Sequence, residues 1–275
     1  MTLLQITVCT PMLVTIDIPP LPVAYEQALK LVRYPDPNVD ELARVIDADP
    51  ALTGAVLRAA NSATSAPVNR ISTARLAVAR LGVEETRRMV IAATLGQAFR
   101  GLRDARIDEA EMWRHLIATA IIADMLAWGE VQQSEAFTAG LLHDIGRLAM
   151  ATSDLRGYRE VVRLARAGLD VSEAEHRVFG HNHLAWAQAV AWNWDFPEDL
   201  TTAITDHHTG QNSRLAWVVA EARRMAYSMG IGNGITFPPD PGDSAEMLPE
   251  LLALGGVDFV EGRIGWFQGA LRRAA

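Results

Sequence analysis

All seven histidines of this 275-residue chain lie between positions 115 and 208, and this clustering indicates a site. Imidazole and carboxylate groups are ligands that iron, manganese, zinc and nickel accept in proteins. The candidate ligands come from separate segments: His115, His143, Asp144, His183, His207, His208 and Glu221. They suit one or two divalent ions (iron, manganese, zinc, nickel or magnesium), and two ions close together can activate water for phosphoester hydrolysis.

The adjacent pair His143–Asp144 is the most specific part of this set. It follows a helix expected over 134–142, in which Ala139 and Gly140 are small enough to admit a neighbouring helix or a metal ion. Adjacent side chains on a helix point about 100° apart, so the two groups would flank one point in front of them. The plain alternative is a capping aspartate beside an unrelated histidine.

Other histidines in the set also have structural explanations. His115 stands at helical spacing from apolar neighbours and faces inward, where a lone histidine is more often a hydrogen-bonded core residue. His207 and His208 end a helix that Pro197 begins. A helix C-terminus favours protonated histidine, so a capping role and a ligand role are equally open for them.

Two glutamates have local explanations as well. Glu221 is flanked by apolar residues on an expected helix, so its carboxylate needs a partner, which is a metal ion, Arg224 or solvent. Glu175 follows Ser172 by three residues, which is capping-box spacing, and a structural role is expected for it.

The elements that position these residues are expected to be helices, with no strand alternation between 23 and 230. Asn38 and Glu41 have capping-box spacing, and Asp49–Pro50 combines an N-cap with a proline at the first helical position. Further helices are expected over 84–100, 109–127 and 134–142. Ser72, Asp108, Ser134 and Ser172 are each expected to cap the start of a helix, and two more helices are expected to begin at His183 and Pro197.

Composition limits the class of protein. The net charge is −8 and 49% of the residues are hydrophobic, so the chain has no general attraction for nucleic acid or anionic membranes. The single cysteine, Cys9, fits a reducing compartment. We see no signal peptide and no apolar run long enough to span a membrane, and therefore expect a cytoplasmic protein.

Two longer motifs, DPALTGAVLRAANSA in the first half and AGLLHDIGRL in the second, give the sequence a family resemblance. From about Pro20 to Ala226 it resembles the HDOD (HD-related output domain) family of bacterial proteins. The resemblance implies an all-α, two-lobe fold whose C-terminal lobe has a helical core similar to that of HD-superfamily metal phosphohydrolases. HDOD proteins are generally regarded as signalling outputs, often without demonstrated catalysis.

The resemblance also suggests a division of the chain. Residues 1–18 are strand-like, a short N-terminal β segment, and 19–107 form the N-terminal helical lobe. Residues 108–236 form the HD-like lobe, and 237–275 hold a linker and a C-terminal amphipathic helix.

The chain departs from the catalytic HD pattern in three places. Glu221 stands where the HD superfamily has a late aspartate. Arg147 replaces a lysine that relatives hydrolysing cyclic di-GMP carry, and we expect it to contact phosphate or another ligand. The segment HHTGQNSRL lacks their GYP signature, which argues against that activity.

A regulatory module of bacterial signal transduction, acting through protein or small-ligand contacts, is therefore the favoured function, and we lean against an enzyme. A metal-dependent phosphohydrolase acting on a nucleotide or another phosphoester is the alternative. Expected partners are a signalling protein or an upstream receiver domain, or a second copy of the chain, and no membrane. A nucleic-acid-binding regulator is the least favoured function, because the chain is acidic and its arginines between 70 and 88 are not interleaved with aromatic residues.

Overall fold

The computed structural model describes residues 30–31, 38–62, 70–99, 101–129, 131–236 and 248–271. Within these ranges every regular element is a helix, which confirms the all-α prediction. The strand-like segment expected over 1–18 and the start of the expected linker at 237–243 lie outside the described residues. None of the described helices is long and apolar enough to cross a membrane.

The described helices follow one another along the chain with short connections. The first group consists of α2 (Val39–Asp47), α3 (Pro50–Asn61), α4 (Ala74–Leu81), α5 (Val83–Ala98) and the 3-10 helix η1 (Leu102–Ala105). The second group consists of α6 (Glu109–Leu126), α7 (Gln133–Leu142), α8 (Ile145–Ser153), α9 (Leu155–Arg166), α10 (Val171–Phe179), α11 (His183–Asn193), α12 (Glu198–Thr205) and α13 (Arg214–Ser228). The chain then forms α14 (Leu248–Ala253) and α15 (Gly256–Leu271).

Several helix starts lie where local capping chemistry predicts them. Asn38 and Glu41 form the expected reciprocal capping box at α2. Asp49 accepts hydrogen bonds from the first backbone N–H groups of α3, which has proline at its first position. Asp108 accepts from the backbone N–H of Glu111 and so caps α6. These side chains satisfy N–H groups that have no partner inside the helix.

Three predicted caps are wrong, because a neighbouring side chain or an earlier start takes the position. Thr73, rather than Ser72, accepts from the first turn of α4. α7 begins one residue before Ser134. Asp170, rather than Ser172, caps α10 through the backbone N–H of Glu173. The single C-terminal helix expected after the linker is interrupted between Ala253 and Gly256: Gly255, which has a positive φ angle, lies between α14 and α15, and Gly256, also with a positive φ angle, begins α15.

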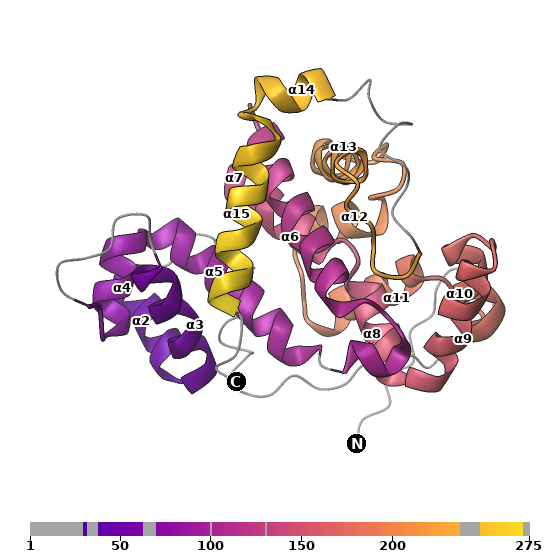
Figure 1. Cartoon of the computed structure of the whole chain (residues 1–275), viewed down its shortest axis with the longest axis horizontal. Coiled ribbons are helices and arrows are strands. Elements are labelled where there is room, and N and C mark those ends of the chain that lie inside the picture. The colour runs from indigo at the N-terminus through magenta and orange to yellow at the C-terminus, as the bar shows by residue number, and fades with distance from the viewer. Residues whose placement is uncertain are drawn as a thin grey trace.

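The helix α6 occupies the centre of the molecule (Figure 1). It packs against α7 and α13 on the side of the second group. α15 lies along α6 and also contacts α3 and α5 of the first group, so it ties the two groups together. Figure 1 shows α2, α3 and α4 at one end and α9 and α10 at the other.

Two glycines allow the His143–Asp144 turn to approach its neighbours closely. A Cβ atom at Gly140 would lie 2.8 Å from the Ala120 Cα of α6. A Cβ atom at Gly146 would overlap the carbonyl oxygen of His183 and lie 2.7 Å from the Ala187 backbone nitrogen of α11. Because side chains are excluded at both positions, α6, α7, α8 and α11 meet around the turn.

Candidate metal centre

Four parts of the second helical group, α6 to α13, supply the converging side chains. α6 supplies His115, the turn between α7 and α8 supplies His143 and Asp144, and α11 supplies His183 at its first residue. The turn after α12 supplies the last two: His207 and His208. The structure thus brings together six of the seven ligands expected from the sequence, in two groups whose ligand atoms lie within 4.8 Å of one another. Five of the six residues are buried, and only His208 is exposed.

The first ligand group consists of His115, His143 and Asp144. The Nε2 atoms of the two histidines are 3.1 Å apart. The Asp144 Oδ2 atom lies 3.5 Å from His143 Nε2 and 3.9 Å from His115 Nε2. Three ligand atoms therefore face a common space inside the helical core.

The second ligand group consists of His183, His207 and His208. His183 Nε2 lies 2.8 Å from His208 Nε2, and the rings of His207 and His208 are in contact with centroids 4.4 Å apart. Asp144 connects the two groups, because its Oδ1 atom lies 3.4 Å from His207 Nε2 and 3.9 Å from His183 Nε2.

Three of the histidines are oriented by a hydrogen bond at Nδ1. The Nδ1–H group of His143 donates to the Gly140 carbonyl at 2.7 Å, and that of His207 donates to the Ile204 carbonyl at 2.7 Å. His183 donates from Nδ1 to Glu175 Oε2 at 2.5 Å. In the neutral tautomer this leaves a lone pair on each Nε2 atom, directed into the centre, and such outer hydrogen bonds are typical of metal-ligating histidines.

Two of the convergent atoms are buried acceptors without a hydrogen-bond donor: Asp144 Oδ1 and His207 Nε2. They face each other across 3.4 Å. A buried acceptor without a donor costs free energy, and a cation placed between these atoms would remove that cost for both. The donor set of imidazole nitrogens and a carboxylate oxygen therefore fits a divalent transition metal ion.

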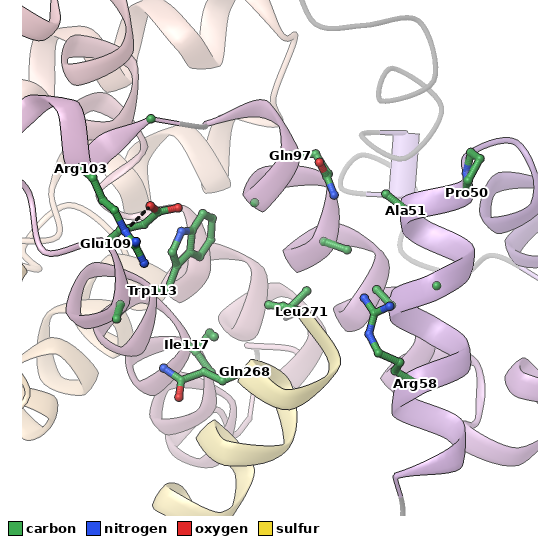
Figure 2. A pocket seen from close by; sticks show the side chains of 16 residues that line it. Pro50, Ala51, Arg58, Gln97, Arg103, Glu109, Trp113, Ile117, Gln268 and Leu271 are labelled. Atoms are coloured by element: carbon green, nitrogen blue, oxygen red, sulfur yellow. Dashed lines mark ion pairs between the residues drawn. The ribbon is translucent and has the colours of Figure 1, made fainter. Parts of the chain in front are cut away.

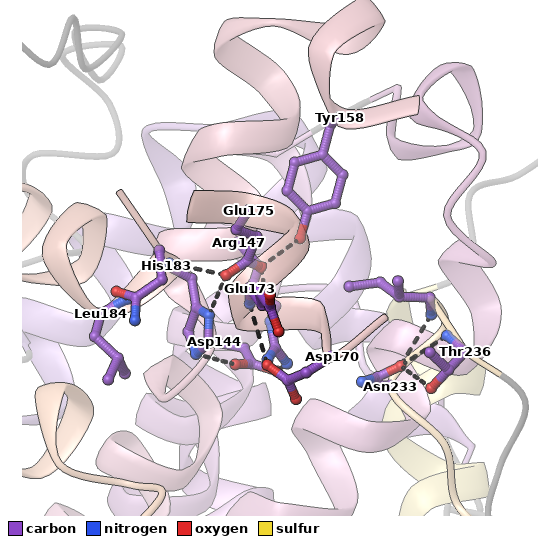
Figure 3. Close-up of polar contacts among 12 residues, drawn as sticks. Asp144, Arg147, Tyr158, Asp170, Glu173, Glu175, His183, Leu184, Asn233 and Thr236 are labelled. Atoms are coloured by element: carbon purple, nitrogen blue, oxygen red, sulfur yellow. Dashed lines mark hydrogen bonds and ion pairs between the residues drawn. The ribbon is translucent and has the colours of Figure 1, made fainter. Parts of the chain in front are cut away.

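The second oxygen of Asp144 is already occupied. The buried guanidinium of Arg147 donates from Nη1 to Asp144 Oδ2 at 2.7 Å and from Nε to Glu175 Oε1 at 3.3 Å. Tyr158 donates its hydroxyl to Glu175 Oε1 at 3.0 Å, and the backbone N–H of His183 donates to Glu175 Oε2 at 2.9 Å. Figure 3 shows Arg147 between the two carboxylates, with Tyr158 and His183 on Glu175. This network fixes one side of the centre without a metal ion.

The environment favours the neutral forms of His115, His143 and His183 and the ionised forms of Asp144 and Glu175. Burial lowers the pKa of His115 to about 3 and that of His183 to about 4, although nearby carboxylates oppose both shifts. Burial also opposes ionisation of Asp144, but the positive charge of Arg147 holds the pKa of this carboxyl well below its ordinary value. For Glu175 the hydrogen bond from His183 and the charge of Arg147 outweigh burial and lower the pKa. Neutral imidazoles and an ionised carboxylate are the protonation states that metal binding requires.

Two expected site residues are placed differently from the others. Glu221 pairs with Arg224 one turn along α13, and among the described residues it belongs to neither convergent group. Its role as a metal ligand stays a prediction. Arg147 is 1% exposed and forms ion pairs with Asp144 and Glu175 of the protein itself. Its expected contact with phosphate therefore also stays a prediction.

Glu175 and Tyr158 also belong to the centre, although they were not predicted from the sequence. Glu175 forms no capping box with Ser172, and it is fully buried with four hydrogen bonds to Arg147, Tyr158 and His183. Its place on the same helical face as Val171 was the available signal, because a carboxylate on an apolar face needs a buried partner.

Comparisons with known proteins identify relatives of this chain. The family model described as HDOD domain matches residues 18–210. The structure resembles that of an HDOD domain protein of unknown function from Geobacter sulfurreducens, with 25% identity, a TM-score of 0.67 and coverage of 92% of this chain and 84% of that one. It also resembles a candidate signal transduction protein from Marinobacter aquaeolei VT8, with 23% identity, a TM-score of 0.72 and coverage of 94% and 61%.

A curated sequence relative is an uncharacterized protein of Treponema pallidum (strain Nichols), 24% identical over 204 residues. The match covers 70% of this chain but only 38% of that protein. The chain thus spans well under two thirds of this relative and about three fifths of the Marinobacter protein.

Proposed function

The chain belongs to the HDOD domain family, and on that premise we propose that it is a signal-transduction output module whose HD-type centre binds one metal ion as a structural and regulatory element. The module acts in the cytoplasm through contacts with a signalling protein or with a receiver domain of a longer protein. It does not hydrolyse a phosphoester.

The observation that carries this proposal is the ion pair between Arg147 and Asp144. In a centre with two ions, one carboxylate commonly bridges both metals, so both of its oxygens must be available. Here Asp144 Oδ2 accepts from Arg147 at 2.7 Å, and only Oδ1 has no donor. The guanidinium supplies the positive charge that a second ion would bring, which supports a stoichiometry of one.

The residues that would hold the ion are those with inward-facing acceptor atoms: His143, Asp144, His183 and His207. All four residues are buried, with essentially no exposed surface. His208, which lies beside them, is exposed. An ion in this position would be enclosed by protein and would stabilise the packing of α7, α8, α11 and the turn after α12.

A metal-dependent phosphohydrolase is the second candidate, and the position of His208 favours it. This exposed imidazole touches His183 Nε2 at 2.8 Å, so the second histidine group reaches the surface. A metal ion there would supply a Lewis acid for phosphoester hydrolysis.

Metal analysis combined with an activity assay separates the two candidates. The full chain is purified without a histidine tag and incubated with Mn²⁺, Fe²⁺ or Zn²⁺. After the excess is removed, bound metal and hydrolysis of bis(p-nitrophenyl) phosphate are measured. The variants are His183→Ala and His207→Asn, and the control is His176→Ala, which removes an exposed histidine of α10 outside the centre.

We expect one ion per chain in the wild type and in His176→Ala, less in the two centre variants, and no hydrolysis in any sample. Hydrolysis that is lost in His183→Ala and His207→Asn but kept in His176→Ala would establish the phosphohydrolase instead. A wild-type chain that retains no ion would refute the metal-binding role.

A further inference from the structure

A groove opens on the side of α6 that faces the first helical group (Figure 2). Its walls come from α3, α5, α6 and α15, with η1 at one end. Its volume is about 810 Å³, within the size range of small-molecule sites. None of its lining residues belongs to the metal centre, so the groove is a separate feature of the fold.

Small residues keep the groove open. α3 contributes Ala51 and Gly54, and α5 contributes Ala93 and Gly96. A Cβ atom at Gly96 would meet only the Cζ2 atom of Trp113, at 3.9 Å, so the space in front of this glycine is unfilled. A glycine inside a helix costs roughly 1 kcal/mol relative to alanine, and close packing of the protein does not require one at position 96.

Two guanidinium groups border the groove from opposite sides. Arg58 of α3 donates from Nε to the Ala270 carbonyl at 2.9 Å, which fixes the side chain, and among the described residues it has no carboxylate partner. Arg103 of η1 pairs with Glu109 at 3.4 Å while its side chain is 81% exposed. Such a solvated pair contributes little, so an anion can displace it. Figure 2 shows Arg58 and Arg103 on the two sides of the open space.

An aromatic ring and a side-chain amide complete the lining. The indole of Trp113 on α6 forms part of the wall beside Gly96. Gln97 of α5 also lines the groove. A primary amide both donates and accepts hydrogen bonds, so its exposed edge can pair with a polar ligand.

We propose that this groove binds a nucleoside phosphate. The base lies against Trp113 with its polar edge toward the Gln97 amide, and the phosphate is directed toward the guanidinium groups at the rim of the groove. A simple anion would leave the indole and the amide unused, and an apolar ligand would leave both guanidinium groups unused. A planar ring with N–H donors joined to an anionic group matches all four side chains. This inference goes beyond the proposed function and does not depend on the metal centre.

Isothermal titration calorimetry with the full chain in EDTA tests the proposal. The probes are AMP, GMP, ATP and GTP, together with the nucleosides adenosine and guanosine and with inorganic pyrophosphate. We expect at least one nucleotide to bind about tenfold or more tightly than either its nucleoside or pyrophosphate, because stacking and phosphate contacts both contribute.

A matched pair of glycine variants locates the binding site. Gly96→Leu fills the groove and should abolish binding while the far-UV spectrum stays helical, because leucine forms helices better than glycine. Gly262→Leu is the control, since nothing lies within 4 Å of a Cβ atom at this exposed glycine of α15. Arg58→Gln should weaken binding by about tenfold, whereas Arg75→Gln, an exposed arginine on α4, should leave it unchanged.

Three results overturn the proposal. The first is the absence of nucleotide binding to the wild-type chain at millimolar concentration. The second is binding to Gly96→Leu as tight as to Gly262→Leu, which would place the ligand elsewhere. The third is binding of pyrophosphate as tight as that of every nucleotide, which would make the groove a site for simple anions. Metal binding by the same samples remains a separate readout of the proposed function.

Discussion

Substituting Arg147 by methionine should destabilise the metal-free protein strongly. The side chain is 2% exposed and carries the positive charge that compensates Asp144 and Glu175. Methionine keeps much of the volume and removes the charge. Both carboxylates then remain in the core without their shared counter-ion.

The structure sets the size of the effect. The bond to Asp144 Oδ2 is short, 2.7 Å, and the contact with Glu175 Oε1 is longer, 3.3 Å. Glu175 keeps its bonds from Tyr158 and His183, so Asp144 carries most of the loss. Removing one partner of a buried ion pair costs about 3–5 kcal/mol, and we expect a decrease of this size in the free energy of unfolding at pH 7.

Urea unfolding followed by far-UV circular dichroism in EDTA measures this decrease. The double variant Arg147→Met, Asp144→Asn should recover part of it, because the uncompensated charge is gone. The control is Arg163→Met, whose ion pair with Glu160 is exposed to solvent, so its loss should leave the urea midpoint nearly unchanged. A decrease below about 1 kcal/mol for Arg147→Met itself would refute the assignment of this buried pair.

Three further predictions concern the same centre. Gly146→Ala should cost more than about 3 kcal/mol, because its Cβ atom would overlap the backbone of α11, whereas Gly265→Ala on α15 should be neutral or slightly stabilising; equal effects in urea unfolding would contradict the packing. Burial lowers the pKa of His115 to about 3 and that of His183 to about 4, from an ordinary value of 6.5. At a pH below 6.5 the unfolded chain therefore binds more protons at these histidines than the folded chain does. In EDTA the free energy of unfolding should therefore fall from pH 6.5 towards pH 4, by about 1.4 kcal/mol per pH unit for each histidine, and a flat profile would be the contrary result. Tyr158→Phe removes one hydrogen bond to an ionised carboxylate and should cost about 1.5–3 kcal/mol, and an unchanged urea midpoint would show that this bond is absent.

Much of the fold was predictable because helix starts are local. The capping box at Asn38 and the caps at Asp49 and Asp108 depend on residues within one turn, which the sequence displays directly. Where several polar residues stand close together, local chemistry leaves more than one choice. Asp170 caps α10 in place of Ser172.

The centre was only partly predictable, because it depends on contacts between helices that are distant in the sequence. The sequence supplied the convergent histidines and Asp144 but not their arrangement, which depends on how α6, α8 and α11 pack. Glu175 was missed because its spacing from Ser172 offered a sufficient local explanation. Glu221 shows the opposite case: its apolar surroundings predicted a partner, and Arg224 one turn away supplies it.

The groove was not predictable from local patterns. Arg58 on α3, Trp113 on α6 and Gln268 on α15 meet there although they are far apart in the sequence. Only the packing of α15 across both helical groups brings these walls together.

We infer that the HD-type centre binds a single ion beside the Arg147–Asp144 ion pair. Anomalous X-ray diffraction from crystals soaked in Mn²⁺, with data collected to distinguish manganese from lighter atoms, would show how many ions bind and where. We expect one anomalous peak in contact with His143, Asp144, His183 and His207, with Arg147 still bonded to Asp144. Two peaks sharing Asp144, with Arg147 displaced, would contradict it, as would the absence of any peak in this centre.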